Sequence, residues 1–216
     1  RARSHTQRLS ARTPRTSLTR SKRNPHLSSS MSRTSRFQGC LLGLALGDAF
    51  GAPWEGGLLE RWVWRVIGTT QGKRRYTDDT QMTVALTEGL LDVGLYAELD
   101  SQMNAIGRRF IEWRDTAPSR APGNTCLTGV MQFEIGIPWR ESGIAGSKGC
   151  GSAMRVATLG YLYQHDMHKL MEIARASGII THGHPAAVAA CVAAAYLVKL
   201  ALDGVHPREY LAAVLD

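Results

Sequence analysis

Cysteine is scarce in this sequence of 216 residues, and its four cysteines lie far apart: Cys40, Cys126, Cys150 and Cys191. Zinc sites built from cysteine need ligands paired at short spacing, which this sequence does not contain. Disulfide-dependent secreted domains carry more cysteine for their length. The pattern therefore predicts reduced thiols in a cytoplasmic protein.

A long apolar run is also missing. The longest stretch, from Ala186 to Val198, has 13 residues, most of them alanine, and Lys199 interrupts it. A helix that spans a membrane needs about 20 predominantly apolar residues. The sequence therefore predicts no membrane partner.

Acidic side chains are absent from residues 1–36, which hold ten Lys or Arg residues. The whole chain has 26 basic and 18 acidic side chains, so residues 37–216 are close to neutral. The first segment has no regular apolar face, and we expect a disordered basic tail. Three origins stay open: an organelle transit peptide, a nucleic-acid-binding arm, or translated sequence upstream of a true start at Met31. Because the positive charge lies in the tail, we expect no nucleic-acid partner for the folded part.

Strand signals are scarce as well, since only Trp62 to Ile67 alternates between apolar and polar residues. Elsewhere apolar residues recur at helical spacing, as in Met103, Ile106, Phe110 and Trp113. The sequence therefore predicts one all-α domain over residues 37–216. The expected helices cover residues 37–50, 79–93, 100–115, 126–133, 153–163, 167–176, 185–203 and 210–215. In a helical bundle, the loops between them can converge at one end and form a site.

Thr77, Asp78 and Asp79 place one hydroxyl and two carboxylates at an expected helix start. Hard oxygen donors of this kind suit magnesium or manganese. A second interpretation is structural, because Asp78 followed three residues later by Gln81 also fits a capping box. The residues alone leave both interpretations open.

The loop from Gly149 to Ser152 precedes an expected helix. Backbone amides at a helix N-terminus can bind an anion such as a diphosphate. A tight turn with Ser152 as the N-cap fits the same residues. Arg155, inside the expected helix, fits either a structural ion pair or a phosphate contact.

Other polar residues have equally plain structural explanations when taken singly. Glu55 fits a solvated surface carboxylate, and Asp48 fits a residue that fixes loop geometry through hydrogen bonds. His184 is expected to be structural. Trp54, Trp139 or a nearby tyrosine could stack on an aromatic base.

Taken in order, these motifs form a more specific combination: Gly47, Asp48, Gly51 to Pro53 and Glu55; Tyr76 to Gln81; Gly123 to Cys126; Gly149 to Arg155; and Thr181 to Pro185. The set resembles the ADP-ribosylglycohydrolase family, which includes dinitrogenase reductase-activating glycohydrolases and a lens crystallin. The resemblance covers about residues 37–205. It implies an all-α bundle with a Mg²⁺ or Mn²⁺ pair in loops at one end. It also implies hydrolysis of the glycosidic bond between ADP-ribose and a protein side chain or small acceptor.

The resemblance also implies roles for individual residues. Thr77, Asp78 and Asp79 match the first half of the family's metal site, and Glu55 matches an acid/base residue that we expect to act with Asp79. The residues implied in substrate binding are Asn124, Gly149, Cys150, Gly151, Ser152, Met154 and His182.

The family's second metal cluster, an Asp, any residue, Asp, Thr sequence, has no match in this chain. We therefore expect a chain that is truncated relative to the family. We also expect a monomer. Two functions stay open: a metal-dependent hydrolase, and a catalytically inactive ADP-ribose-binding or structural relative.

Overall fold

The computed structural model describes residues 32–55, 57–59, 61–63, 66 and 75–215. These residues are mostly helical, and within them only an isolated parallel bridge between Ile144 and His182 has β geometry. The all-α prediction is confirmed. The predicted strand at Trp62 to Ile67 is wrong for Trp62, Val63 and Val66, which are helical, and its other residues lie outside the described ranges.

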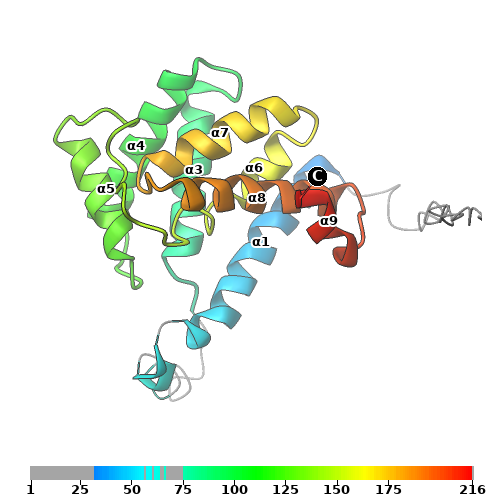
Figure 1. Ribbon diagram of the computed structural model, residues 1–216, viewed down its shortest axis with the longest axis horizontal. Coiled ribbons are helices and arrows are strands. Elements are labelled where there is room, and N and C mark those ends of the chain that lie inside the picture. Colours follow the sequence, from blue (N-terminus) through cyan, green and yellow to red (C-terminus); the bar gives the residue numbers. More distant parts are fainter. Residues whose placement is uncertain (1–31, 56, 60, 64–65, 67–74, 216) are drawn as a thin grey trace, which may run out of the picture. The chain divides into compact units, whose positions relative to one another are not determined.

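The helices follow one another along the chain, with a long connection between α5 and α6 (Figure 1). Their bounds are α1 (Arg33–Gly51), η1 (Ala52–Trp54), α3 (Asp78–Val93), α4 (Leu99–Thr116), α5 (Asn124–Glu134), α6 (Ala157–Leu162), α7 (Met167–Ile179), α8 (Pro185–Leu202), η2 (Pro207–Glu209) and α9 (Tyr210–Leu215). Because α1 begins at Arg33, with Ser32 as its N-cap, residues 33–36 belong to the helix and not to the expected tail. Residues 1–31 lie outside the described ranges.

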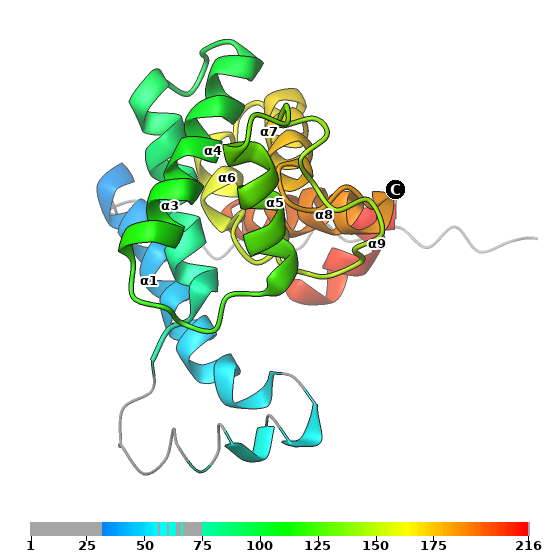
Figure 2. The same ribbon diagram turned by 90° about the vertical axis from the view of Figure 1, so that its left-hand side faces the viewer.

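Helices α3 and α4 pack side by side and form one half of the core (Figure 2). Their buried apolar residues recur at helical spacing, with Met82, Leu86 and Leu90 on α3 and the expected Ile106 and Phe110 on α4. The two backbones approach closely at Gly89, where an added Cβ atom would lie 2.7 Å from the Cα atom of Ile106. Two amphipathic faces thus bury each other.

Helices α7 and α8 pack together, and α6 packs against α8. Helix α8 is longer than the 13-residue apolar run, and by length and composition alone it is able to cross a membrane. A mostly buried core helix passes the same test. Of α8, 28 % is buried, and the helix supplies Cys191 and Ala195 to the hydrophobic core. Gly204, expected to follow this helix, has φ +75° and ends it in the left-handed conformation.

Helix α6 differs most from the expectation. It begins at Ala157 instead of Ala153, because residues 151–155 form turns. The carbonyl oxygen of Cys150 accepts hydrogen bonds from the amides of Ala153, at 2.8 Å, and Met154, at 3.2 Å. Ser152 is fully buried and donates to the carbonyl oxygen of Ala187, at 3.3 Å, so it is not an N-cap.

A candidate metal and ligand site

The start of α3 is held by a carboxylate from α1. Asp48 is the one buried residue of α1, and it lies inside the helix, not in the expected loop. Its Oδ1 atom accepts from the Thr77 hydroxyl at 2.7 Å, and its Oδ2 atom accepts from the Thr77 amide at 2.8 Å. The hydroxyl and amide of Thr80 also donate to Oδ2, at 2.6 and 3.2 Å. Asp48 therefore does more than shape a loop: it caps α3 from another helix.

The predicted capping box is wrong. Thr77, not Asp78, is the N-cap, and its hydroxyl accepts from the Asp79 amide at 3.4 Å. Gln81 does not return to the helix start. Its amide nitrogen donates to the carbonyl oxygen of Pro118 at 3.0 Å, and its amide oxygen accepts from the Trp113 indole at 3.1 Å.

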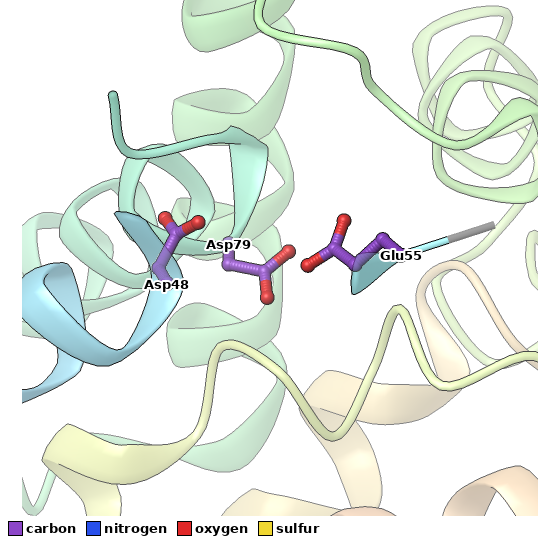
Figure 3. Close-up of side chains that lie close together, drawn as sticks. All are labelled: Asp48, Glu55 and Asp79. Atoms are coloured by element: carbon purple, nitrogen blue, oxygen red, sulfur yellow. The ribbon is translucent and has the colours of Figure 1, made fainter. Parts of the chain in front are cut away.

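Three carboxylates from separate parts of the chain converge beside this helix start (Figure 3). Asp48 comes from α1, Glu55 follows η1, and Asp79 lies in the first turn of α3. One oxygen of each lies within 4.8 Å of the others. The carboxylates of Asp79 and Glu55 face each other, so two negative groups share one small space.

This clustering raises the pKa of two of the carboxylates. Desolvation, followed by repulsion from Asp48, Glu55 and Asp78, raises the pKa of Asp79 to about 7, although the Thr77 hydroxyl opposes the shift. Desolvation and the charges of Asp48 and Asp78 raise the pKa of Glu55. None of the ion pairs between described residues includes these carboxylates. The cluster therefore lacks a compensating cation from the described protein.

The donor chemistry fits a divalent cation that prefers oxygen. Both oxygens of Asp48 are already engaged by Thr77 and Thr80, so Asp48 suits a positioning role better than direct ligation. Glu55 and Asp79 keep oxygens that face the shared space. Asp78 is buried and is not part of the triad; desolvation raises its pKa, and hydrogen bonds from its own backbone and that of Gly123 oppose the rise. The ligand set Thr77, Asp78 and Asp79 stays a prediction.

The glycine loop does not lie at a helix N-terminus, which is the position that the anion-binding prediction assumed. A helix N-terminus was predicted here, but the helix begins only at Ala157. What remains is a turn in which, among the described residues, no protein atom accepts from the amides of Cys150, Gly151 and Ser152. Gly149 and Cys150 are exposed, and Met154 packs against the core.

His182 lies directly against this loop. A Cβ atom at Gly151 would lie 2.9 Å from the ring carbon Cε1, and one at Gly149 would lie 3.4 Å from Nε2. The side chain is 2 % exposed. Desolvation and, second, the charge of Arg155 lower the pKa of His182 to about 4, so the imidazole is neutral at physiological pH.

Of the remaining candidate residues, two are exposed and two are held by contacts with other parts of the protein. Asn124 is the first residue of α5 and is exposed, next to Gly123. Trp54 is 72 % exposed beside Glu55, whereas Trp139 is buried and has Arg140 over its ring at 4.2 Å. His184 caps α8, with Nδ1 accepting from the Ala186 amide at 3.0 Å.

Sequence reasoning missed Asp48 as a member of the acidic cluster, and it gave no role of their own to Thr80 and Thr181, although both lie inside the quoted motifs. A carboxylate inside an otherwise apolar helix was the available signal for Asp48, because a buried acid needs partners. Thr80 and Thr181 had no local signal. Their partners lie 32 and 26 residues away in the sequence.

Comparisons with known proteins agree on one family. The family model described as ADP-ribosylglycohydrolase matches residues 29–216. ADP-ribosylhydrolase ARH3 of Mus musculus is 32 % identical over 196 residues, which cover 82 % of this chain and 51 % of the relative. The ADP-ribosyl-[dinitrogen reductase] glycohydrolase of Rhodospirillum rubrum is 32 % identical over 187 residues, covering 78 % of this chain and 58 % of the relative.

A solved structure titled "ADP-ribosylglycohydrolase-related protein complex" is also similar. It has a TM-score of 0.57 and 28 % sequence identity, and the match covers 84 % of this chain and 61 % of that one. The chain thus spans between about half and three fifths of the length of the relatives it matches.

Proposed function

Because the chain belongs to the ADP-ribosylglycohydrolase family, we propose that it forms part of a metal-dependent hydrolase that releases ADP-ribose from modified side chains. The bond cleaved is the glycosidic bond to a protein side chain or a related small acceptor. Two similar proteins are named as hydrolases of this kind. The observation that carries the proposal is the convergence of Asp48, Glu55 and Asp79 without a cationic partner among the described residues.

The proposed cofactor is Mg²⁺ or Mn²⁺. Asp79 would hold the ion, with Thr77 and Asp78 as the further ligands that the sequence predicts, and Glu55 would lie beside it. When bound, such an ion orients ribose hydroxyls and lowers the pKa of a water molecule. Asp48 contributes indirectly, because it fixes Thr77 and the first turn of α3.

Glu55 is the proposed acid/base residue. Glycoside hydrolysis passes through a transition state in which positive charge develops on the sugar, and it needs a proton for the leaving group and a base for water. In the metal-free chain, burial and neighbouring charge raise the pKa of Glu55, and a bound cation would oppose that rise. The acid/base role is therefore supported by the position of Glu55, whose carboxylate faces Asp79. Asp79 faces it and would stabilise the developing positive charge.

The ligand would extend from the acidic cluster toward the glycine loop. Its diphosphate would accept hydrogen bonds from the amides of Cys150 and Gly151, which have no acceptor among the described residues. Asn124 and His182 would hydrogen bond to the nucleotide part, and the exposed Trp54 is available to stack on a base. We further propose a cytoplasmic monomer.

Calorimetric titration of the chain with ADP-ribose, with and without Mg²⁺ or Mn²⁺, tests the proposal. Metal-dependent binding that is lost in Asp79→Asn supports it. Glu88→Gln is a matched control, because it removes a charge from an exposed position on the same helix. No binding to a chain shown to be folded would contradict the proposal.

A second assay distinguishes the proposed hydrolase from an inactive ADP-ribose-binding protein. The same preparations are incubated with peptides ADP-ribosylated on arginine or serine, and free ADP-ribose is measured. Binding with release supports the hydrolase. Binding without release by the chain, under conditions where a full-length relative releases ADP-ribose, favours the inactive relative.

A further inference from the structure

Arg155 is buried without a carboxylate partner. Its side chain is 0 % exposed, and the ion pairs between described residues do not include it. The sequence left an ion pair or a phosphate contact open. Arg155 forms no ion pair with a described residue, and the phosphate contact stays a prediction. The guanidinium lies over the Phe110 ring at 4.5 Å from the ring centre. A desolvated charge of this kind is costly, so its hydrogen bonds carry information about why it is retained.

Both nitrogens at the end of Arg155 donate, with Nη1 lying 3.7 Å from the sulfur of Met82. The Nη2 atom lies 2.8 Å from the carbonyl oxygen of Ser177 and 2.8 Å from the Thr181 hydroxyl oxygen. An arginine can only donate, because it has no acceptor atom. Thr181 is therefore the acceptor in its bond with Arg155 and keeps its own hydroxyl proton for another partner.

That second partner is His182. The Thr181 hydroxyl oxygen lies 2.8 Å from Nδ1 of His182, and both residues are buried. If Nδ1 carried a proton, Arg155 and His182 would both donate to the Thr181 hydroxyl oxygen. The hydroxyl hydrogen of Thr181 would then have no acceptor in either contact. If Thr181 donates, its hydroxyl hydrogen and the hydrogens that Arg155 directs at Ser177 and Thr181 all have acceptors. The Nε atom of Arg155 has no partner among the described residues with either tautomer.

The backbone holds this arrangement rigidly. The amide of Ile144 donates to the carbonyl oxygen of Thr181 at 3.0 Å, and the carbonyl oxygen of Ile144 accepts from Gly183 at 3.2 Å. The amide of His182 donates to the carbonyl oxygen of Gly178 at 2.9 Å. These bonds fix the backbone on both sides of His182, and the contact of Nδ1 with the Thr181 hydroxyl then sets the ring beside the glycine loop.

We propose that Arg155 is a positioning residue that acts through Thr181 to fix His182 with its proton on Nε2, facing the Gly149–Gly151 loop. Among the described residues, Nε2 has no hydrogen-bond partner, although the residue is 2 % exposed. The Nε2–H group is thus available to donate to an acceptor oxygen of a bound ligand. This ligand role rests on the proposed function, whereas the tautomer is a property of the ligand-free chain.

The tautomer is tested by long-range ¹H–¹⁵N NMR of the histidine rings in the ligand-free chain, with His182→Asn used to assign the signals. The expected spectrum shows an unprotonated, hydrogen-bonded Nδ1 and a protonated Nε2. In Arg155→Met, Thr181 can either donate or accept, so the Nδ1-protonated form gains population. A protonated Nδ1 in the unmodified chain, or an unchanged ring in Arg155→Met, overturns the proposal.

A second pair of variants covers the case in which Arg155→Met does not fold. Thr181→Ser keeps the hydroxyl and should keep the ring signals, whereas Thr181→Val removes it and should shift Nδ1. Ser142→Ala is the matched control, because it deletes a buried hydroxyl that donates to the neighbouring Ile180 carbonyl but leaves the chain of donors intact. Equal ring signals in Thr181→Val and Thr181→Ser overturn the proposal.

Titration with ADP-ribose separates this inference from the proposed function. Thr181→Val should weaken the binding of ADP-ribose by on the order of fivefold, because the Nε2–H donor of His182 is no longer fixed. Thr181→Ser should bind ADP-ribose as tightly as the unmodified chain. Absence of binding by the unmodified chain with the expected tautomer contradicts the proposed function and leaves the tautomer assignment standing. Equal affinity of the unmodified chain and Thr181→Val overturns the positioning role.

Discussion

Among single residues, Asp79 has the clearest link to pH. Its pKa is raised from 3.8 to about 7 in the folded protein, first by desolvation and then by Asp48, Glu55 and Asp78. The folded state therefore holds the proton more tightly than the unfolded state. The stabilisation from this proton is fully present below pH 3.8 and is lost as the pH rises through about 7.

We therefore predict that Asp79→Asn raises the melting temperature of the metal-free protein more at pH 8 than at pH 5. The amide removes the buried charge that appears in this range. Thermal unfolding followed by circular dichroism, with a chelator present, measures both proteins at each pH. A constant difference between the two proteins across the range would contradict the raised pKa.

A bound metal ion should favour the ionised form of Asp79, whereas the metal-free site favours the protonated form. A cation must displace the proton from Asp79, so the affinity for Mn²⁺ should rise with pH between about 6 and 8. Saturating Mn²⁺ should also reduce the stability advantage of Asp79→Asn at pH 8. Calorimetric titrations in buffers of different ionisation enthalpy measure the released proton, and binding that releases no proton at pH 6.5 would contradict the site.

The role of a residue in the candidate site could be predicted from the sequence only where a local motif surrounds it. Asp79 and Glu55 were found as candidate site residues because short motifs surround them. The part of Asp48 in the cluster could not be read locally, since it depends on how α1 lies against α3. The same holds for Arg155, whose partners Ser177 and Thr181 are far along the chain.

Among the helices, α3 depends on a cap that another helix supplies. Asp48→Asn replaces an acceptor of four hydrogen bonds by a group with only one accepting atom. It also removes repulsion that raises the pKa values of Glu55 and Asp79. We expect the lost bonds to dominate, with a net loss of about 2 kcal/mol in the free energy of unfolding.

Urea unfolding at pH 7 measures this loss. Thr80→Val is the graded comparison, since it removes only one side-chain bond to Asp48 and should cost about half as much. A more stable Asp48→Asn protein would mean that charge repulsion outweighs capping at this helix start.

Two glycines should respond in opposite ways to the same substitution. Gly89→Ala places a Cβ atom 2.7 Å from the Cα atom of Ile106, so α3 and α4 must separate. Gly43→Ala on α1 meets no atom within 4 Å and gains helix propensity. We expect a loss of about 1 to 3 kcal/mol for the first and a gain of roughly 0.5 to 1 kcal/mol for the second. Chemical denaturation of both variants measures the contrast, and equal effects would contradict the close packing.

Helix bounds were predictable wherever an apolar stripe or a terminal glycine marked them. Residues 100–115 and 210–215 were expected, and α4 and α9 cover Leu99–Thr116 and Tyr210–Leu215. The prediction failed at α6, because Ser152 has the local signature of an N-cap but is used for a long-range hydrogen bond to Ala187. Tertiary partners outweighed local propensity there.

For the whole molecule, the all-α class followed from the periodicity of the sequence, but the exposure of α1 did not. Leu42 and Leu46, four residues apart on one face of this helix, are 64 and 58 % exposed. Gly39, Gly43 and Gly47 also meet no described atom within 4 Å of an added Cβ. Periodicity shows that a helix has an apolar face, but not whether another element covers it.

An apolar helix face open to water favours association as the protein concentration rises. We predict that the double variant Leu42→Gln and Leu46→Gln lowers self-association and raises solubility, with little change in the free energy of unfolding, because neither side chain is buried. Leu91→Gln, an exposed leucine on α3 at 59 %, is the control for exposure alone. Sedimentation velocity across a range of concentrations measures the effect. If the control reduces association as much as the double variant, self-association depends on general surface hydrophobicity and not on the face of α1.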